Sequence, residues 1–410
     1  MKKKIKISGT GCALGDYLYA GINFSGPVFK KYLSKSPGSG GLEPGKLVFV
    51  TELEKYTGMT FYNLLKEITG AKKPSSFNIG GPGIVALIHA AQILYDKNAI
   101  VSFYGYYGND TTGYDINCIL SYTPLETSHY CKNRNPSPYT YVLSDPNFDN
   151  GNGERIFINH PGAAEFYTIK NLDNNFWNSD IITFGGTALV PDIHENLGLL
   201  LFKGKQKGCV TVVHTVYDFP SEYLHPGEKW KLGKTDCYNQ IDLLIMDKEE
   251  AFGYTGKKSL EESLNCLIAK GPGAIILSDG AGPVHLYSDG RLFQKLSHVR
   301  MPVSAAVRDD MDIACRKECD TTGCGDNFAG GVIASLAQQL QDRKPGTLNL
   351  AEACAMGIAS GAFACFYFGG TYREKKRGEK QQKVYSFYQR YREQVKSTEI
   401  ESLLDTQYLR

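Results

Sequence analysis

The sequence lacks a long hydrophobic run. No segment approaches the roughly 18 consecutive apolar residues of a membrane span. The longest apolar stretches are strand-sized, such as "DLLIM" and "AIILS". The basic start "MKKKIKIS" is not followed by the apolar core of a secretory signal. We therefore expect a cytoplasmic protein that has no membrane partner.

The sequence also lacks an excess of charge of either sign. Its 45 Lys and Arg residues nearly balance 43 Asp and Glu residues, for a formal net charge of +2. Such a chain has no global field that would attract nucleic acid, so we expect no nucleic-acid partner. The tail 371–410 is rich in Lys, Arg and Tyr and predicts a charged, solvated helical extension. RNA binding by this tail is the less favoured alternative.

Paired cysteine motifs are absent as well. The 11 cysteines are odd in number and form no CxxC pair, which disfavours a disulfide framework and a structural zinc site. A chain of 410 residues can bury a large core without such cross-links. Reduced thiols agree with a cytoplasmic location.

What the sequence does contain is a regular alternation of β-rich and helical segments. "KIKIS", "AIVSFYGYYG", "SDIITFGG", "CVTVVHTV" and "AIILS" are strand-like, and helical stretches such as "GIVALIHAAQIL" lie between them. This order predicts an α/β core with a mostly parallel sheet and helices on both faces. We assign residues 1–16, 78–121 and 169–370 to that core, whose strand ends are where such folds bind ligands.

Two segments interrupt the alternation, 17–77 and 122–168. The first is rich in Gly, Pro, Lys and aromatic residues, and the second contains the Asn/Gly turns typical of hairpins. Together they predict a small substrate-binding β lid. Ligands of α/β folds bind outside the carboxyl ends of the strands, so a lid would cover that edge. Exposed lid strands could also pair with a second copy, which favours a homodimer.

The most unusual stretch is "CDTTGCGDNFAGG", residues 319–331, which crowds glycines around Asp326 before the apolar run "VIASLAQQL". A Gly-rich turn that opens into a helix points N–H groups and the positive end of the helix dipole at one spot, which attracts phosphate. An acid there suits a base that takes a proton from a hydroxyl while the backbone holds a phosphoryl group. The alternative is a tight turn in which Asp326 only starts a helix.

Two other glycine motifs carry less weight. "GGLEPGKL" imitates a phosphate-binding loop, but Leu47 stands where Ser or Thr should hold magnesium, and a strand-like run follows instead of a helix. We reject it. "GTGCALG" from Gly9 imitates a dinucleotide turn, but the expected acid about 20 residues later is missing. An NAD-linked oxidoreductase therefore stays a minor alternative.

The order of several motifs resembles the PfkB (ribokinase-like) family of sugar and nucleoside kinases. "DTTGCGDNFAGG" is similar to the family signature DTxGAGDxFxxG, with Cys324 where Ala is usual. "NIGGPG", "GYYGNDTTG", "DKEE" and "SDGAGP" precede it in the family's order, so the resemblance covers about residues 5–370. It implies a three-layer α/β/α ribokinase-like sandwich with a mostly parallel central sheet and a small β-sheet lid. It also implies an ATP-dependent carbohydrate kinase.

The resemblance also implies the roles of individual residues. The general base would be Asp326, and the acceptor would contact Asp16, Gly80 and Gly81. The remaining implied roles are an anion hole of backbone N–H groups at Gly323, Cys324 and Gly325, nucleotide contacts at Asp247, Ser278, Gly280 and Gly282, and a magnesium ion ordered through water by Glu250. ATP and Mg²⁺ are thus the expected cofactors, with a monovalent cation as a further candidate.

The acceptor is less well defined. The family often has Asn shortly after the Gly-Gly pair, whereas this chain has Val85. We expect a hydroxymethyl group on a small sugar or sugar-like molecule, with a nucleoside such as adenosine or inosine as the alternative. A non-catalytic sugar- or nucleotide-binding regulator is a third hypothesis, which the intact Asp326 disfavours. We interpret Arg308 as a surface residue rather than a phosphate contact and His160 as structural, outside the catalytic set.

Overall fold

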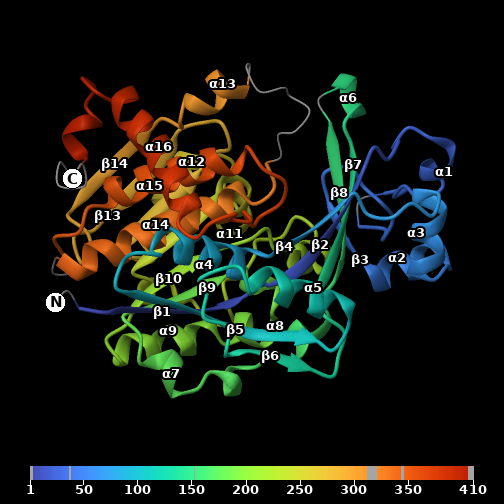
Figure 1. The fold of residues 1–410 in the computed structure, drawn as a ribbon, viewed down its shortest axis with the longest axis horizontal. Helices are drawn as coiled ribbons and strands as arrows, with labels where there is room; N and C mark the ends of the chain where they lie inside the picture. Colours follow the sequence, from blue (N-terminus) through green and yellow to red (C-terminus); the bar gives the residue numbers. More distant parts are fainter. Residues whose placement is uncertain (1–2, 37, 152, 312–320, 343–345, 405–410) are drawn as a thin grey trace.

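The computed structural model describes residues 3–36, 38–151, 153–311, 321–342 and 346–404. Within them the chain forms a large sheet of nine strands and a small sheet of five strands (Figure 1). The apolar side chains gather in three clusters, one on each face of the large sheet and one beside the small sheet.

The large sheet has the strand order β14-β13-β12-β11-β10-β9-β1-β5-β6. Every neighbouring pair from β12 to β6 is parallel, and only β13 is reversed, pairing antiparallel with both β12 and β14. The mostly parallel sheet is therefore confirmed. The strands are β1 (Ile5–Gly11), β5 (Ala99–Gly108), β6 (Tyr130–Asn133), β9 (Ile181–Gly185), β10 (Val210–His214), β11 (Leu243–Asp247), β12 (Ala274–Ser278), β13 (Val284–Ser288) and β14 (Leu296–Met301).

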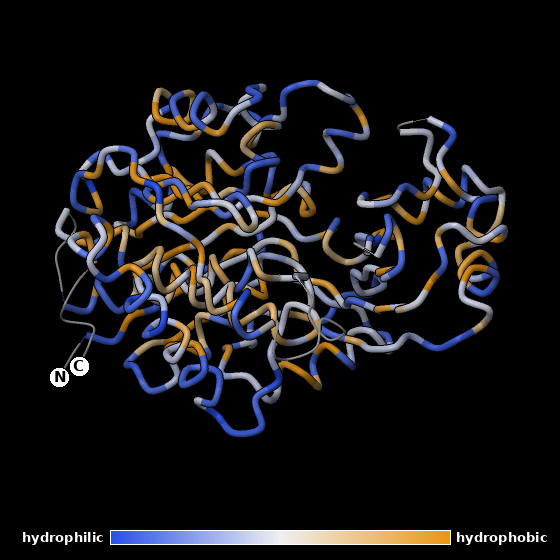
Figure 2. The backbone as a smooth tube through the Cα atoms, turned by 90° about the horizontal axis from the view of Figure 1, so that it is seen from above, coloured by the Kyte–Doolittle hydropathy of each residue, from blue (hydrophilic) through white to orange (hydrophobic). Residues whose placement is uncertain are grey.

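Helices cover both faces because successive strand residues point to opposite sides. Ile181 packs into one apolar cluster and Ile182 into the other. Figure 2 shows these apolar segments inside the core and hydrophilic ones around it. One face carries α4 (Pro82–Ile93), α5 (Thr111–Leu120), α14 (Cys324–Asp342), α15 (Leu350–Ala364) and α16 (Glu379–Gln394); the other carries α7 (Asn174–Trp177), α8 (Pro191–Glu195), α9 (Leu197–Gln206), α11 (Lys248–Thr255) and α12 (Leu260–Lys270).

The small sheet stands beyond the carboxyl ends of the large sheet's strands (Figure 1). Its order is β3-β8-β7-β2-β4, and β7 and β8 form an antiparallel hairpin. Three helices cover the face turned away from the core. The elements are β2 (Leu14–Ala20), β3 (Leu47–Phe49), β4 (Ser76–Gly80), β7 (Tyr139–Asp145) and β8 (Glu154–His160), with α1 (Pro27–Lys30), α2 (Val50–Thr57) and α3 (Phe61–Thr69).

The boundaries of the two interrupting segments differ from the prediction. β2 begins at Leu14 and β4 ends at Gly80, so the small sheet extends beyond both ends of 17–77. β6 lies inside 122–168 yet pairs with β5 in the large sheet. The described residues also form the short helices α6 (Phe148–Gly151), α10 (Phe219–Leu224) and α13 (Ala306–Met311) and the 3-10 helices η1 (Gly162–Phe166), η2 (Ile169–Asn171), η3 (Thr187–Leu189), η4 (Tyr238–Gln240) and η5 (Glu401–Leu403).

The C-terminal extension is helical, but the prediction of a solvated helix was wrong. In α16, Val384, Tyr388 and Tyr391 are fully buried in the core cluster, and so is the Lys380 side chain. Most residues of this helix are charged or polar, but Val384, Tyr388 and Tyr391 lie on one side of it and face the core. No helix in the described ranges is long and apolar enough to cross a bilayer.

Candidate active site

The strand ends of the large sheet bring the predicted site residues to one edge. Gly11 at the end of β1 is level with Gly185 of β9, which is level with His214 of β10. Asp247 of β11 is level with Ser278 of β12. Because parallel strands share their carboxyl edge, the motifs after β1, β11 and β12 meet there, as in other open α/β sheets.

The N-terminus of α14 has the geometry of an anion site. Gly323, just before the helix, has φ +77°, and a Cβ atom on it would lie 2.5 Å from the Gly370 Cα atom, so only glycine fits. A Cβ atom on Gly325 would meet nothing within 4 Å, which leaves open space in front of this turn. The Cys324 N–H donates a long hydrogen bond of 3.2 Å to the Thr321 carbonyl. The Cys324 Sγ atom lies 3.3 Å from the Cys365 Sγ atom.

Asp326 lies in the first turn of α14 and is partly buried. Loss of hydration raises the pKa of its carboxyl from 3.8 to about 7. A general base works best when its pKa is near the working pH, because a large fraction is then deprotonated and still binds a proton well. Asp326 is therefore suited to accept a proton from a hydroxyl.

Asp326 lies near both Cys12 and Glu250. Burial raises the pKa of the Cys12 thiol, and the nearby Asp16 and Asp326 carboxylates raise it further. Asp326 also contributes to the raised pKa of Glu250. The structure thus brings Asp16 and Asp326 to the same thiol, and Asp326 within electrostatic reach of Glu250.

The predicted acceptor residues pack against one another. A Cβ atom on Gly80 would lie 1.9 Å from the Asp16 Oδ2 atom, so this carboxylate rests directly on the Gly80 backbone. Gly81 has φ +95°, and a Cβ atom there would lie 2.7 Å from the Cys12 carbonyl oxygen. The Gly-Gly pair is needed because β4 enters α4 directly over the β1–β2 connection.

Asp247 and Glu250 form a reciprocal cap at the start of α11. The Glu250 N–H donates to Asp247 Oδ1 (2.8 Å), and the Asp247 N–H donates to Glu250 Oε2 (3.0 Å). The Thr215 hydroxyl also donates to Glu250 Oε2, at 2.6 Å. Glu250 is buried, and this burial, with the adjacent Asp247, raises its pKa to about 8.

This pair fits a magnesium ion held largely by other ligands. Within the described residues, no group of three or more His, Cys, Asp or Glu side chains is placed to hold a metal by itself. Magnesium prefers oxygen ligands, usually one or two carboxylates together with substrate phosphates and water. Asp247 and Glu250 supply such oxygens at the sheet edge, near Asp326 in the first turn of α14.

The raised pKa of Glu250 gives a prediction about magnesium. With a pKa of about 8, Glu250 gains its charge only as the pH is raised through that value, so a magnesium ion ordered by this carboxylate should bind more tightly there. Glu250→Gln should raise the magnesium concentration for half-maximal activity about 10-fold, as outer-shell changes do, and should abolish this pH dependence. Magnesium titrations measured at several pH values test it, with Glu249→Gln, an exposed neighbour, as the control. If the magnesium titrations of Glu250→Gln and the wild type coincide, Glu250 serves only as part of the helix cap.

The predicted nucleotide residues after β12 form a turn next to Asp247. Gly280 has φ +53°, and the Gly282 N–H donates to the Asp279 carbonyl at 2.6 Å. The Asp279 carboxylate pairs with Lys248 at 3.2 Å, across from the start of α11. The turn therefore lies beside the α11 cap, with Ser278 paired to Asp247 through the sheet.

Arg155 of β8 is a residue of this site that the sequence analysis did not predict. Its guanidinium donates from Nη2 to the Thr321 hydroxyl (2.8 Å) and from Nη1 to the Thr322 hydroxyl, just before the anion site. The small sheet thus touches the loop that carries the glycines. The alternation along β8, which leaves Ile156 and Ile158 in the outer apolar cluster, is the signal that places Arg155 on the core-facing side.

A row of side chains crosses this core-facing side of the small sheet. Asp16 is level with Thr140 on β7, Thr140 with Asn159 on β8, and Asn159 with Phe49 on β3. Residues that are level on neighbouring strands share a face. The Asn159 amide donates to the Thr140 hydroxyl at 2.9 Å. Because strands lie about 4.8 Å apart, Phe49 is roughly 14 Å across the sheet from Asp16.

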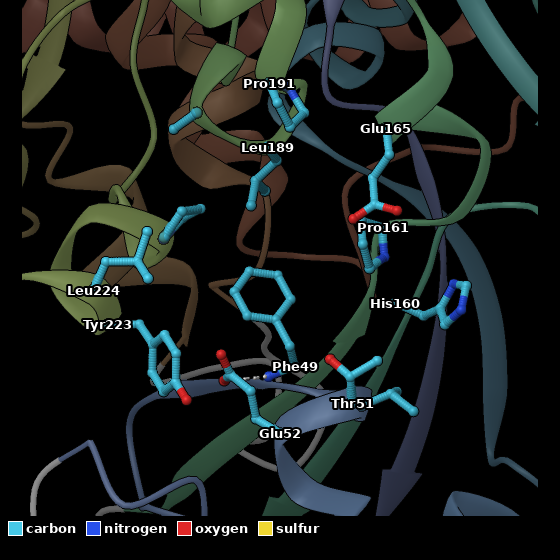
Figure 3. A pocket seen from close by; sticks show the side chains of 13 residues that line it. Phe49, Thr51, Glu52, His160, Pro161, Glu165, Leu189, Pro191, Tyr223 and Leu224 are labelled. Carbon is cyan, nitrogen blue, oxygen red and sulfur yellow. Dashed lines mark hydrogen bonds between the residues drawn. The ribbon is translucent and has the colours of Figure 1, made fainter. Parts of the chain in front are cut away.

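A cavity of about 340 Å³ opens at the Phe49 end of this row. Figure 3 shows Phe49 between Tyr223 and Leu224 of α10 on one side and His160 and Glu165 on the other. Glu52 and Tyr223 interact across it, which joins the small sheet's segment to the core. The full lining is Phe49, Val50, Thr51, Glu52, His160, Pro161, Glu165, Ala188, Leu189, Pro191, Pro220, Tyr223 and Leu224.

His160 and Arg308, which we interpreted from the sequence as non-catalytic, lie at the cavity wall and on the surface, respectively. His160 stacks on Tyr139 with ring centroids 4.9 Å apart and borders the cavity. Arg308 in α13 is 80% exposed and pairs weakly with Asp309 (3.7 Å), as a surface residue does.

A family model described as pfkB family carbohydrate kinase matches residues 59–377. Among solved structures, ribokinase from Thermotoga maritima is 18% identical, with a TM-score of 0.59 over 94% of this chain and 99% of its own. Adenosine kinase from Anopheles gambiae, in complex with P1,P4-di(adenosine-5) tetraphosphate, is 18% identical, with a TM-score of 0.63 over 88% and 95%. A putative ribokinase II from E. coli in complex with ATP and Mg²⁺ is 15% identical, with a TM-score of 0.60 over 94% and 99%.

Proposed function

Because the chain belongs to the PfkB family of carbohydrate kinases, we propose that it transfers a phosphoryl group from ATP to a hydroxymethyl group on a small sugar or sugar-like molecule. One observation carries this proposal. Asp326 lies at the N-terminal turn of a helix preceded by Gly323, has a pKa of about 7, and interacts electrostatically with Glu250. A base beside an anion site is what phosphoryl transfer to a hydroxyl requires.

In this mechanism Asp326 accepts the proton of the acceptor hydroxyl as the oxygen attacks. The backbone N–H groups of Gly323, Cys324 and Gly325 hold the transferring phosphoryl group, helped by the positive end of the α14 dipole. Asp16 accepts hydrogen bonds from other acceptor hydroxyls, and the bare backbone at Gly80 and Gly81 lets the acceptor approach closely.

The nucleotide would lie along the ends of β11 and β12, at Asp247, Ser278, Gly280 and Gly282. Magnesium, when bound with ATP, neutralises the phosphate oxygens, and Glu250 would order it through water. Arg155, which reaches Thr321 from the small sheet, would add positive charge near the transferring group.

A nucleoside is the second candidate acceptor, and the cavity beside Phe49 favours it. Its walls combine an aromatic ring, prolines and leucines with the acids Glu52 and Glu165. Such a lining suits a planar base that is apolar on its faces and carries hydrogen-bonding edges. An acceptor whose sugar is held at Asp16 could extend its base along the row toward Phe49.

The experiment that tests the proposal is a panel of acceptors with ATP and magnesium, read as ADP release. It should include free sugars such as ribose and fructose and the nucleosides adenosine and inosine. Acceptor-dependent ADP release supports kinase activity, and the preferred compound separates the two candidates. Nucleotide or sugar binding without turnover on any acceptor would instead indicate a binding regulator.

We also propose that the small sheet with α1–α3 is a lid that excludes water during transfer. Hydrogen exchange of β3, β8 and α2 should slow when the accepted compound binds, because these elements border the cavity. The β13–β14 pair, at the far edge of the large sheet, is the internal control. Protection confined to the α/β core would contradict a lid role.

A further inference from the structure

A buried lysine lies behind the anion site. The Lys380 side chain, in the first turn of α16, is completely buried. Its Nζ atom donates a 2.7 Å hydrogen bond to Asn327 Oδ1 and lies 5.5 Å from the centre of the Tyr367 ring. Burial keeps the pKa of Lys380 well below its usual range, opposed by the Glu374 carboxylate. Charged or neutral, an amine retains an N–H to donate to Asn327.

The amide of Asn327 is fixed on both of its polar atoms. Its Oδ1 atom accepts from Lys380 Nζ, from the Tyr367 hydroxyl (2.9 Å) and from His89 Nδ1 (2.7 Å). Burial and the nearby Lys380 hold the pKa of His89 well below its usual range, so this histidine is neutral and its Nδ1 carries the hydrogen that faces the oxygen. Three donors from three segments leave the amide a single orientation.

The other end of the amide holds the glycine turn. Asn327 Nδ2 donates to the Gly323 carbonyl and to the Gly370 carbonyl, both at 2.8 Å. Gly323 already rests on Gly370, since even a Cβ atom would not fit between them. The Gly323 carbonyl belongs to the peptide whose N–H is that of Cys324. The Asn327 backbone N–H donates to the same carbonyl at 2.9 Å, so the backbone and the side chain of Asn327 together fix the direction of the Cys324 N–H. The long 3.2 Å bond of that N–H to the Thr321 carbonyl would give way to the phosphoryl group.

We propose that Lys380 is a positioning residue for phosphoryl transfer: through Asn327 it holds the Gly323–Cys324 peptide in the orientation that receives the transferring phosphoryl group. The inference rests on the proposed kinase function and adds to it a residue from the C-terminal extension. Because its side chain is fully buried behind Asn327, Lys380 would act without touching nucleotide or acceptor.

Burying the Lys380 amine costs free energy of folding, which favours a role for this residue beyond stability. A buried amine loses its hydration, and replacing buried polar networks with well-packed apolar residues is often neutral or stabilising. The apolar residues of α16 already anchor the helix to the core. Methionine has a similar length and no polar head, but it leaves the Glu374 carboxylate without its counter-charge, so stability must be measured beside kcat.

The test compares Lys380→Met with Lys383→Met. Lys383 lies one turn along the same helix, is half-exposed and pairs with Glu379 at 3.7 Å, so it controls for loss of a lysine from α16. With the accepted compound from the panel and Mg-ATP, Lys380→Met should lower kcat about 10-fold or more. The KM for the acceptor and the Kd for Mg-ATP should stay within about threefold, because oriented N–H groups act mostly in the transition state. The Tm should fall, because Asn327 Oδ1 and the Glu374 carboxylate each lose a partner, so kcat is compared for equal amounts of folded protein.

A double-mutant cycle separates positioning from folding. If Lys380 acts through Asn327, then Asn327→Ala and the double variant Asn327→Ala/Lys380→Met should have the same kcat within about twofold. Titration with Mg-ATP gives the fraction of binding-competent protein, against which kcat is normalised. If Lys380→Met does not fold, Tyr367→Phe removes another donor to the same oxygen and should lower kcat in the same selective way.

The outcomes are distinguishable. A wild-type protein that transfers nothing to any acceptor contradicts the proposed function itself. A wild-type enzyme that works, with Lys380→Met as fast as Lys383→Met, overturns only the role of Lys380. A loss of kcat that tracks the loss of ATP-binding protein, or that adds fully to Asn327→Ala, shows that Lys380 stabilises the fold and does not position the peptide.

Discussion

Asp326→Asn should lower turnover by the roughly 10²- to 10⁴-fold that general base catalysis contributes. The amide keeps the size and shape of the carboxylate but cannot accept the acceptor's proton. ATP binding should survive, because the backbone at Gly323 to Gly325 is unchanged, and removing a negative charge near the triphosphate should tighten it slightly. Steady-state rates on the accepted compound, measured together with Mg-ATP affinity, check both parts.

Glu261→Gln is the matched control, since Glu261 is an exposed acid in the first turn of α12. Its activity should equal that of the wild type. If Asp326 were only a helix-start residue, Asn would replace it well, since Asn is itself favoured at helix starts. Near-normal turnover of Asp326→Asn would therefore mean that the glycines around it form a turn and not a reaction centre.

The same substitution should stabilise the protein without ligands. Asp326 has a pKa of about 7 in the folded protein against 3.8 as a model group, so the folded state holds the proton more tightly than the unfolded state does. The free energy of unfolding thus falls as the pH rises from about 4 to 7. Asp326→Asn removes this loss and should raise the free energy of unfolding by about 1–3 kcal/mol at pH 8. Little difference should remain at pH 4, and denaturant titrations at both pH values measure it.

The fold could be predicted from the sequence where the signal is local. Strand-sized apolar runs alternating with helical segments give the mostly parallel sheet, and the glycines around Asp326 give the turn into α14. Both depend on neighbouring residues only. The reversed direction of β13, and the pairing of β6 with β5, depend on how separate strands pair, and periodicity does not encode that pairing.

The surroundings of the site were harder to predict for the same reason. Arg155 is separated from Thr321 by 166 positions, and Lys380 from Asn327 by 53. Their roles depend on how separate elements pack. In α16, most residues are charged or polar and only four are buried, so its composition predicts a solvated helix although one side packs in the core. A buried lysine has no local signature that separates it from a surface lysine.

Gly80→Ala should have the second large effect, on the acceptor side of the site. The new Cβ atom would lie 1.9 Å from Asp16 Oδ2, so the carboxylate must rotate away from its present position. Hydrogen bonds to charged groups are worth about 1.5–3 kcal/mol. Losing one between Asp16 and an acceptor hydroxyl should therefore lower kcat/KM about 10- to 100-fold. Mg-ATP affinity should not change, because Asp247 and Ser278 lie on other strands.

Two comparisons show whether this loss acts through Asp16. Asp16→Ala should lower kcat/KM to a similar degree, and the double variant should be no worse than either single one, because both remove the same contact. Gly208→Ala is the control: it also places Ala at positive φ (+77°), but in open space with no heavy atom within 4 Å of the new Cβ atom. It should cost about 1 kcal/mol of stability and leave kcat/KM unchanged. If Gly80→Ala keeps full activity, or if its loss adds to that of Asp16→Ala, the acceptor does not depend on the Asp16 carboxylate, and the substrate must be held elsewhere on the small sheet.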